Sequence, residues 1–224
     1  MKKTYLQIFF TFFIIIGNSQ SFDTNVNNLN SQFQTTLKQI SLGKSNVPLE
    51  IDGSTYFFKN PQDCVLILSD GGNPISLKTN YNLLNETFEV ESEDGLLNLA
   101  PNKISSIRFI ENYFVVFNSK FYELITKNNK FSILKSFSLE AIEPDYQPGI
   151  QDKPNLRYKK ANSLFIVVNN KLSQIKLSKK AIIALFGKSN SKLVKTFMKK
   201  NKISIRDNKD LKLLFDNHQD IIIN

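Results

Sequence analysis

The sequence predicts an α+β fold: a largely antiparallel β-sheet, built as a meander and sandwich-like or roll-like, with a C-terminal cluster of short helices. Three observations indicate this class. From residue 47 to 177 the chain is a series of short segments rich in β-branched and aromatic residues. Most connections between them are two to five residues long, too short for the crossovers that parallel strands require. From residue 178 onward the spacing of apolar residues becomes helical.

The first 19 residues have the features of a secretory signal peptide. Two lysines precede an almost wholly apolar run from residue 5 to 16, and Gly17 and Ser19 supply the small residues that cleavage requires. The apolar run is well short of the roughly 20 residues that span a membrane. We therefore expect export to the periplasm, the outer membrane or the medium, with cleavage after Ser19 or Gln20.

Residues 20–45 form a polar, asparagine-rich segment for which two structures stay open. Apolar residues spaced by three and four positions predict one face of an amphipathic helix that ends at Gly43. These apolar residues are Val26, Leu29, Phe33, Leu37 and Ile40. The high asparagine content lowers helix propensity and leaves a disordered lead-in as the alternative.

Residues 46–177 form the predicted antiparallel region, interrupted by a proline-containing loop at 142–158. The expected strands are VPLEIDGSTYFF, CVLILS, PISLKT, ETFEVES, LLNLA, ISSIRFI, YFVVF, KFYELIT, FSILKSF, SLFIVV and LSQIKL. Turn signals separate them, including Asn118-Ser119 and Asn169-Asn170, which suit the positive backbone angles of tight hairpins.

Residues 178–224 predict three short helices packed on the sheet. Ser178 caps the first and Gly187 ends it, while Asp207 caps the third. The second should turn four residues inward: Leu193, Val194, Phe197 and Met198. The third should do the same with Leu211, Leu214 and Phe215. Helices this short are not stable alone, so we expect them to pack on the end or face of the sheet.

The order of these features resembles that of small exported proteins of Bacteroidota. The matching parts are NLLNETFEVESEDGLLNLAPNKISSIRF, which fits a strand-pair pattern built on E-x-F-x-V and DG, and residues 159–215. The resemblance covers most of the mature chain and implies an exported location. It carries no activity, so it transfers no functional residue.

The charge is divided unevenly along the chain. Residues 20–150 hold 10 basic and 15 acidic residues, whereas residues 151–212 hold 17 basic and 3 acidic ones. Within this basic part the candidate contact residues are Lys192, Lys195, Lys199, Lys200 and Lys202. They could bind an anionic envelope surface or another envelope protein, or simply keep a docked helix solvated. Lysine outnumbers arginine fifteen to two between 151 and 212, which favours diffuse charge over bidentate recognition.

Several chemistries are not supported by the sequence. The tetrapeptide GKSN occurs at 43–46 and 187–190 without the rest of a phosphate-binding loop, and its glycines are better interpreted as helix ends. His218, the only histidine, is expected on the surface, and Cys64, the only cysteine, is expected to be a buried hydrophobe. We therefore predict no cofactor, no metal site and no catalytic residue. Export and the lack of interleaved aromatics argue against nucleic acid.

Glu89, Glu91 and Glu93 alternate along a predicted strand. They form either its solvent-exposed face or the acid–base residues of a carbohydrate or lipid hydrolase, which would need a cleft and one partly buried carboxylate. The 19 phenylalanines raise a second alternative, an apolar-ligand carrier with an enclosed pocket. The leading expectation remains a non-enzymatic exported interaction or structural module.

Overall fold

The computed structural model describes residues 22–44, 53–143 and 155–222, together with residues 145, 147 and 149, and it describes side chains from residue 30 onward. The predicted signal peptide lies outside these ranges, as does much of the loop predicted at 142–158.

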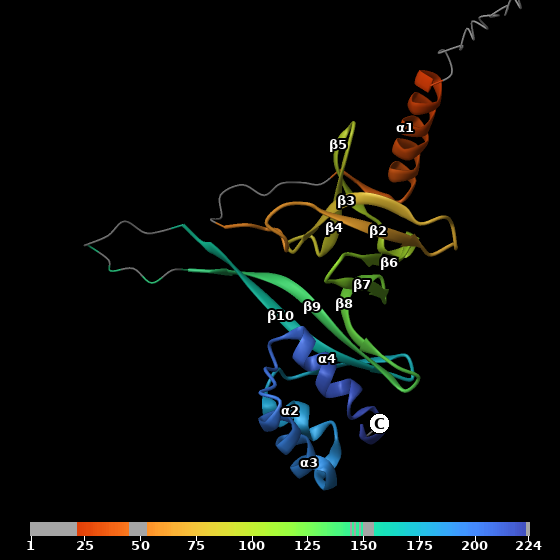
Figure 1. The fold of residues 1–224 in the computed structure, drawn as a ribbon. Coiled ribbons are helices and arrows are strands. Elements are labelled where there is room, and N and C mark those ends of the chain that lie inside the picture. The colour runs from red at the N-terminus through yellow and green to blue at the C-terminus, as the bar shows by residue number, and fades with distance from the viewer. Residues whose placement is uncertain are drawn as a thin grey trace, which may run out of the picture.

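One antiparallel sheet of eleven strands and four α-helices confirm the predicted α+β class (Figure 1). The strands are β1 Ser41–Lys44, β2 Gln62–Leu68, β3 Ile75–Asn82, β4 Thr87–Ser92, β5 Gly95–Leu99, β6 Ile104–Arg108, β7 Tyr113–Phe117, β8 Lys120–Lys127, β9 Phe131–Ile142, β10 Arg157–Val168 and β11 Lys171–Ile175. The helices are α1 Phe22–Gln39, α2 Lys179–Ala184, α3 Gly187–Lys200 and α4 Asn208–Asp216, with 3₁₀ turns at Pro101–Lys103 and Gln219–Ile221.

The sheet is two meanders joined side by side. Its strand order is β1-β5-β4-β3-β2-β6-β7-β8-β9-β10-β11, so pairing of β2 with β6 joins β2–β5 to β6–β11. The hairpins at Asn118-Ser119 and Asn169-Asn170 have φ between 48° and 61°, as their turn chemistry predicts.

Two details at the start of the sheet differ from the sequence-based expectation. The expected helix is present as α1, but it ends at Gln39, and Gly43 lies in β1 with φ of 106° instead of ending the helix. From residue 53 on, the first expected strand makes only an isolated bridge, between Tyr56 and Asn82. The backbone of this segment is held instead by hydrogen bonds to β3, such as that from Phe57 N to Tyr81 O at 2.9 Å.

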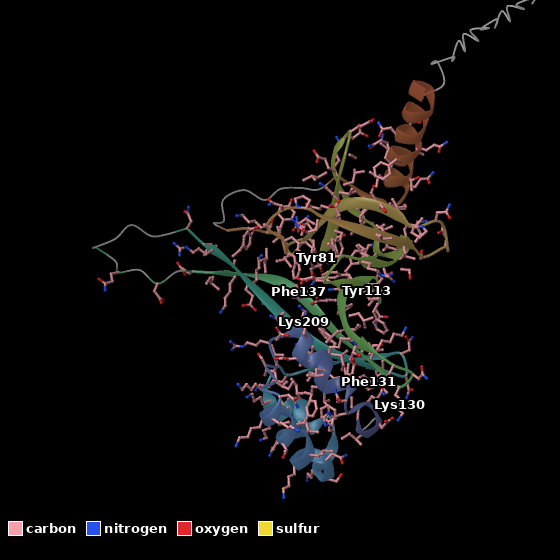
Figure 2. The ribbon with its side chains drawn as sticks, viewed as in Figure 1. Tyr81, Tyr113, Lys130, Phe131, Phe137 and Lys209 are labelled. Atoms are coloured by element: carbon pink, nitrogen blue, oxygen red, sulfur yellow. The ribbon has the colours of Figure 1, made fainter. Side chains whose placement is uncertain are left out.

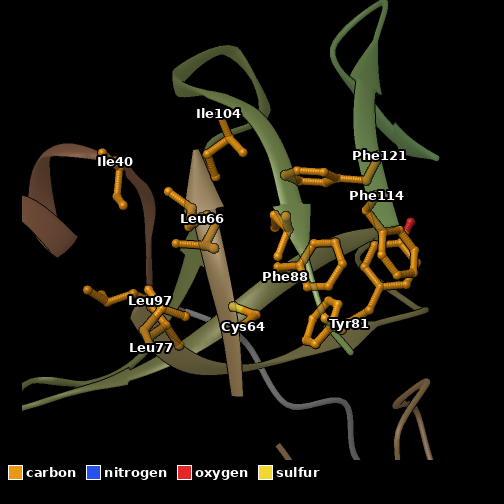
Figure 3. Close-up of a cluster of buried hydrophobic side chains, with 14 of the residues drawn as sticks. Ile40, Cys64, Leu66, Leu77, Tyr81, Phe88, Leu97, Ile104, Phe114 and Phe121 are labelled. Carbon is orange, nitrogen blue, oxygen red and sulfur yellow. The ribbon is translucent and has the colours of Figure 1, made fainter. Parts of the chain in front are cut away.

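Aromatic and aliphatic side chains from β2–β8, together with Leu37 of α1 and Ile40, fill the first core (Figure 3). Phe88 lies at its centre, with ring centroids of Tyr81, Phe114 and Phe121 at 4.8–5.0 Å. Cys64 is buried in this core as predicted, and burial raises the pKa of its thiol to about 12, which leaves it unreactive at neutral pH.

The long β9–β10 hairpin continues beyond the neighbouring strands and packs against the segment around Phe57. The rings of Phe57 and Phe137 lie 4.6 Å apart, and Lys160 Nζ donates to the carbonyl oxygen of Phe57 at 3.2 Å. Phe137, labelled in Figure 2, also lies 6.4 Å from the ring of Phe114 in the first core. The hairpin therefore helps to cover the first core.

The second core lies between the C-terminal helices and strands β8–β11. Ser178 caps α2 by accepting from Ala181 N at 3.2 Å, and Asp207 caps α4 by accepting from Asp210 N at 3.0 Å. The inward residues of α4 are buried as predicted: Leu211, Leu214 and Phe215. Figure 1 shows α2 and α3 at the end of the molecule opposite α1.

A buried polar cluster links the sheet to α4 at the point where β8 meets this helix. Glu123 is 2% exposed, and its two carboxylate oxygens accept from Asn112 Nδ2 at 2.6 Å and from Asn208 Nδ2 at 2.7 Å. Asn208 Oδ1 in turn accepts from Lys135 Nζ at 2.9 Å. Desolvation lowers the pKa of Lys135, while the nearby carboxylates Glu123 and Asp207 act in the opposite direction.

Candidate functional site

The predicted lysines stand on the outer side of α3 and just beyond its end. Lys192, Lys195, Lys199 and Lys200 are all exposed, and exposed Lys202 follows the helix with φ of 53°. The structure adds one lysine that the sequence interpretation missed. Lys188 is exposed in the first turn of α3, and it lies four residues before Lys192 on the same side of the helix. We call the six residues the lysine face: Lys188, Lys192, Lys195, Lys199, Lys200 and Lys202.

The inner side of α3 anchors it to the second core, with one correction to the prediction. Val194 and Met198 are buried, and Phe197 packs against that core partly buried. Leu193, expected on the inner side, is 58% exposed instead. It sits about 100° around the helix from Lys192, beside the lysine face. An apolar residue thus borders the charged surface.

His218 lies in the same core, so the expectation of a surface histidine is wrong. It is buried, with Nδ1 2.9 Å from the carbonyl oxygen of Leu214, so Nδ1 is the donor. Its ring meets those of Phe197 and Phe186 edge-on, with centroids at 4.7 and 5.6 Å. The burial of His218 could not be seen in the sequence because its polar neighbours face outward, while the imidazole packs against α3.

Positive charge is concentrated around α2 and α3 without acidic residues to balance it. Residues 176–206 include nine lysines, one arginine and no aspartate or glutamate. Within the part of the chain that the structure describes, no carboxylate lies within ion-pair distance of a lysine-face ammonium. By contrast Lys209 and Lys212, just beyond, pair with Glu111 and Asp216. The lysine face is therefore free to contact an external anion.

The three alternating glutamates do not share one environment. Glu89 is 3% exposed, whereas Glu91 and Glu93 are exposed. Glu89 and Glu91 line one surface pocket, but Glu93 lies beyond the end of β4 and contacts α1, where Asn30 Nδ2 donates to Glu93 Oε1 at 3.0 Å. The expectation of a uniform solvent face is therefore wrong for Glu89.

A segment of chain covers Glu89. The hydroxyl of Tyr56 donates to Glu89 Oε2 at 2.7 Å, and Asn82 Nδ2 donates to Oε1 at 2.7 Å. Burial, followed by the hydrogen bond to Glu89, raises the pKa of Tyr56 to about 12. The two oxygens of Glu89 thus accept hydrogen bonds from a side chain of the covering segment and from one of β3. Its visible role is to hold Tyr56 over the sheet.

The phenylalanine-rich core offers no separate argument for an apolar ligand. Rings of Phe88, Phe109, Phe114 and Phe121 pack on one another with centroid distances between 4.9 and 6.0 Å. Their mutual contacts account for their burial. The carrier hypothesis therefore gains no support from this cluster.

The two GKSN segments differ from each other in structure. Gly43 lies in strand β1, while Gly187 follows α2 with φ of 78° and begins α3. Among the described residues no group of three histidine, cysteine or acidic side chains is placed to hold a metal ion. None of the described helices is both long enough and apolar enough to cross a membrane.

Comparison of the chain with family models, with curated proteins and with solved structures finds no match.

Proposed function

We propose that this chain is an exported, non-enzymatic protein of the cell envelope that contacts an anionic surface through its lysine face. The observation that carries the proposal is the row of exposed lysines on α3, which has no carboxylate partner among the described residues. Export rests on the signal-peptide pattern of residues 1–19.

An anionic surface would relieve a cost that the lysine face carries in the free protein. Lys188, Lys192, Lys195 and Lys199 follow one another at intervals of four, three and four residues, so neighbours of like charge lie on one side of the helix. Each such pair destabilises a helix by about 0.2–0.5 kcal/mol. Anionic headgroups would neutralise these charges, and exposed Leu193 would add an apolar contact at the interface.

Replacing Lys192, Lys195, Lys199 and Lys200 with glutamine should weaken binding to anionic vesicles strongly. Each lysine near an anionic membrane contributes about 1 kcal/mol, so we expect the partition coefficient to fall on the order of a hundred- to thousand-fold. Sedimentation with vesicles of phosphatidylglycerol and phosphatidylcholine measures the bound fraction directly.

A second variant with the same net charge separates a local surface from a general charge effect. Lys44, Lys103, Lys127 and Lys171 are exposed and lie outside the lysine face, so replacing them with glutamine should change binding less than about threefold. Equal losses in both variants would mean that net charge alone drives binding. No loss in the lysine-face variant would remove the proposal.

A further inference from the structure

A surface pocket on the opposite half of the molecule is built separately from the lysine face. It has a volume of about 430 Å³ and lies between the outer face of β3–β5 and the segment from Tyr56 to Pro61. This volume is within the range of small-molecule sites. Tyr56, Pro61 and Leu96 provide its apolar wall.

Buried side chains beneath the pocket hold its shape. Asn80, which is 5% exposed, binds the backbone of Phe58 twice: its Oδ1 accepts from Phe58 N at 3.1 Å and its Nδ2 donates to Phe58 O at 3.0 Å. Glu89 holds the phenol of Tyr56 in the same way from the neighbouring strand. Two side chains with little exposed surface thus position both the backbone and the aromatic ring of the covering segment.

Charged side chains of both signs line the pocket without forming ion pairs with one another. Lys59, Lys78 and Glu91 line the pocket and are exposed, and none of them forms an ion pair within the described ranges. Counting Glu89, the lining carries two positive and two negative side chains. Ammonium donors and a carboxylate acceptor therefore face the same space, with no net charge to attract an ion.

We propose that this pocket binds a neutral saccharide. A sugar hydroxyl both donates and accepts a hydrogen bond, so vicinal hydroxyls can bind a lysine ammonium and the Glu91 carboxylate at the same time. The C–H face of a sugar ring is apolar and suits the fixed ring of Tyr56 beside Leu96. A ligand with a net charge would gain attraction from one pair of side chains and meet repulsion from the other.

The first test is titration of the mature protein with neutral oligosaccharides, followed by NMR. Maltotriose, cellotriose and N-acetylchitotriose are the probes, and lactate and lysine serve as an anionic and a cationic comparison. We expect at least one oligosaccharide to bind with millimolar affinity or better and to shift resonances of Tyr56 and Leu96. Binding of no oligosaccharide, or tighter binding of either charged probe, would overturn the proposal.

Variants at exposed pocket residues locate the binding without disturbing the fold. Lys78→Met and Glu91→Gln each remove a charge-assisted hydrogen bond and should raise the dissociation constant about tenfold. Lys127→Met, an exposed lysine on β8 away from the pocket, is the matched control and should leave it unchanged. Unchanged affinity in both pocket variants would place the saccharide elsewhere and refute the assignment. Neither variant touches the lysine face, so vesicle binding and saccharide binding can fail independently.

Discussion

Replacing Glu123 with alanine is expected to lower the free energy of unfolding by about 3–5 kcal/mol, the range for breaking a buried charged network. The substitution leaves Asn112 and Asn208 without the acceptor that joins them, and it removes one of the two carboxylates near the buried ammonium of Lys135. Unpaired buried donors and charges lose their solvation without compensation. Urea unfolding followed by circular dichroism measures the change.

Two controls separate this network from surface charge. Glu111→Ala removes an exposed carboxylate 3.8 Å from Lys209, close to the same turn, and should change stability by no more than about 0.5 kcal/mol. Adding Lys135→Met to Glu123→Ala removes the buried ammonium that has lost the Glu123 carboxylate, so the double variant should be more stable than the single one. A loss of less than about 1 kcal/mol in the free energy of unfolding of Glu123→Ala would show that this cluster does not hold α4 to the sheet.

Phe88→Ala should cost about 3–5 kcal/mol, because it opens a cavity at the centre of the first core. Phe88 has no exposed surface, and its ring contacts those of Tyr81, Phe114 and Phe121. Surrounding rings belong to paired strands and have little freedom to collapse into the space. Equilibrium unfolding in urea gives the loss of stability, and its m-value reports whether the native state loosens.

The controls for Phe88→Ala vary either the size of the cavity or its position. Phe88→Leu leaves part of the volume filled and should cost less. Ile110→Ala truncates a side chain that is 99% exposed and should be nearly neutral. Wild-type stability in Phe88→Ala would contradict a packed core at this site.

Much of the sheet could be predicted because its signals are local. Ten of the eleven expected segments lie in strands, and the hairpin pairs Asn118-Ser119 and Asn169-Asn170 adopt the positive φ that their residue types tolerate. β1 was missed because its four residues, Ser41–Lys44, follow a helix directly and carry no alternating pattern of their own. Pairing with β5 holds them in the sheet.

At the candidate sites, the spacing of residues in the sequence does not predict the exposure of every side chain. Exposure of the lysines follows from their helical spacing and was predicted, but the position of Leu193 depends on where the rest of the chain packs. Glu89 has the alternation of a solvent-facing residue, yet the segment containing Tyr56 folds over it. His218 is buried by the rings of Phe197 in α3 and of Phe186 directly before that helix. In each of these cases a distant part of the chain determines the environment.

Sedimentation of the wild-type mature protein with anionic and with neutral vesicles, at low salt and at about 0.15 M salt, tests whether the lysine face binds an anionic surface. Because the screening length falls from about 30 Å at 0.01 M to about 8 Å at 0.15 M, an electrostatic contact must weaken as salt is added. We predict binding to phosphatidylglycerol-containing vesicles alone, strongest at low salt. Absence of binding at low salt, or equal binding to phosphatidylcholine, would contradict a working lysine face.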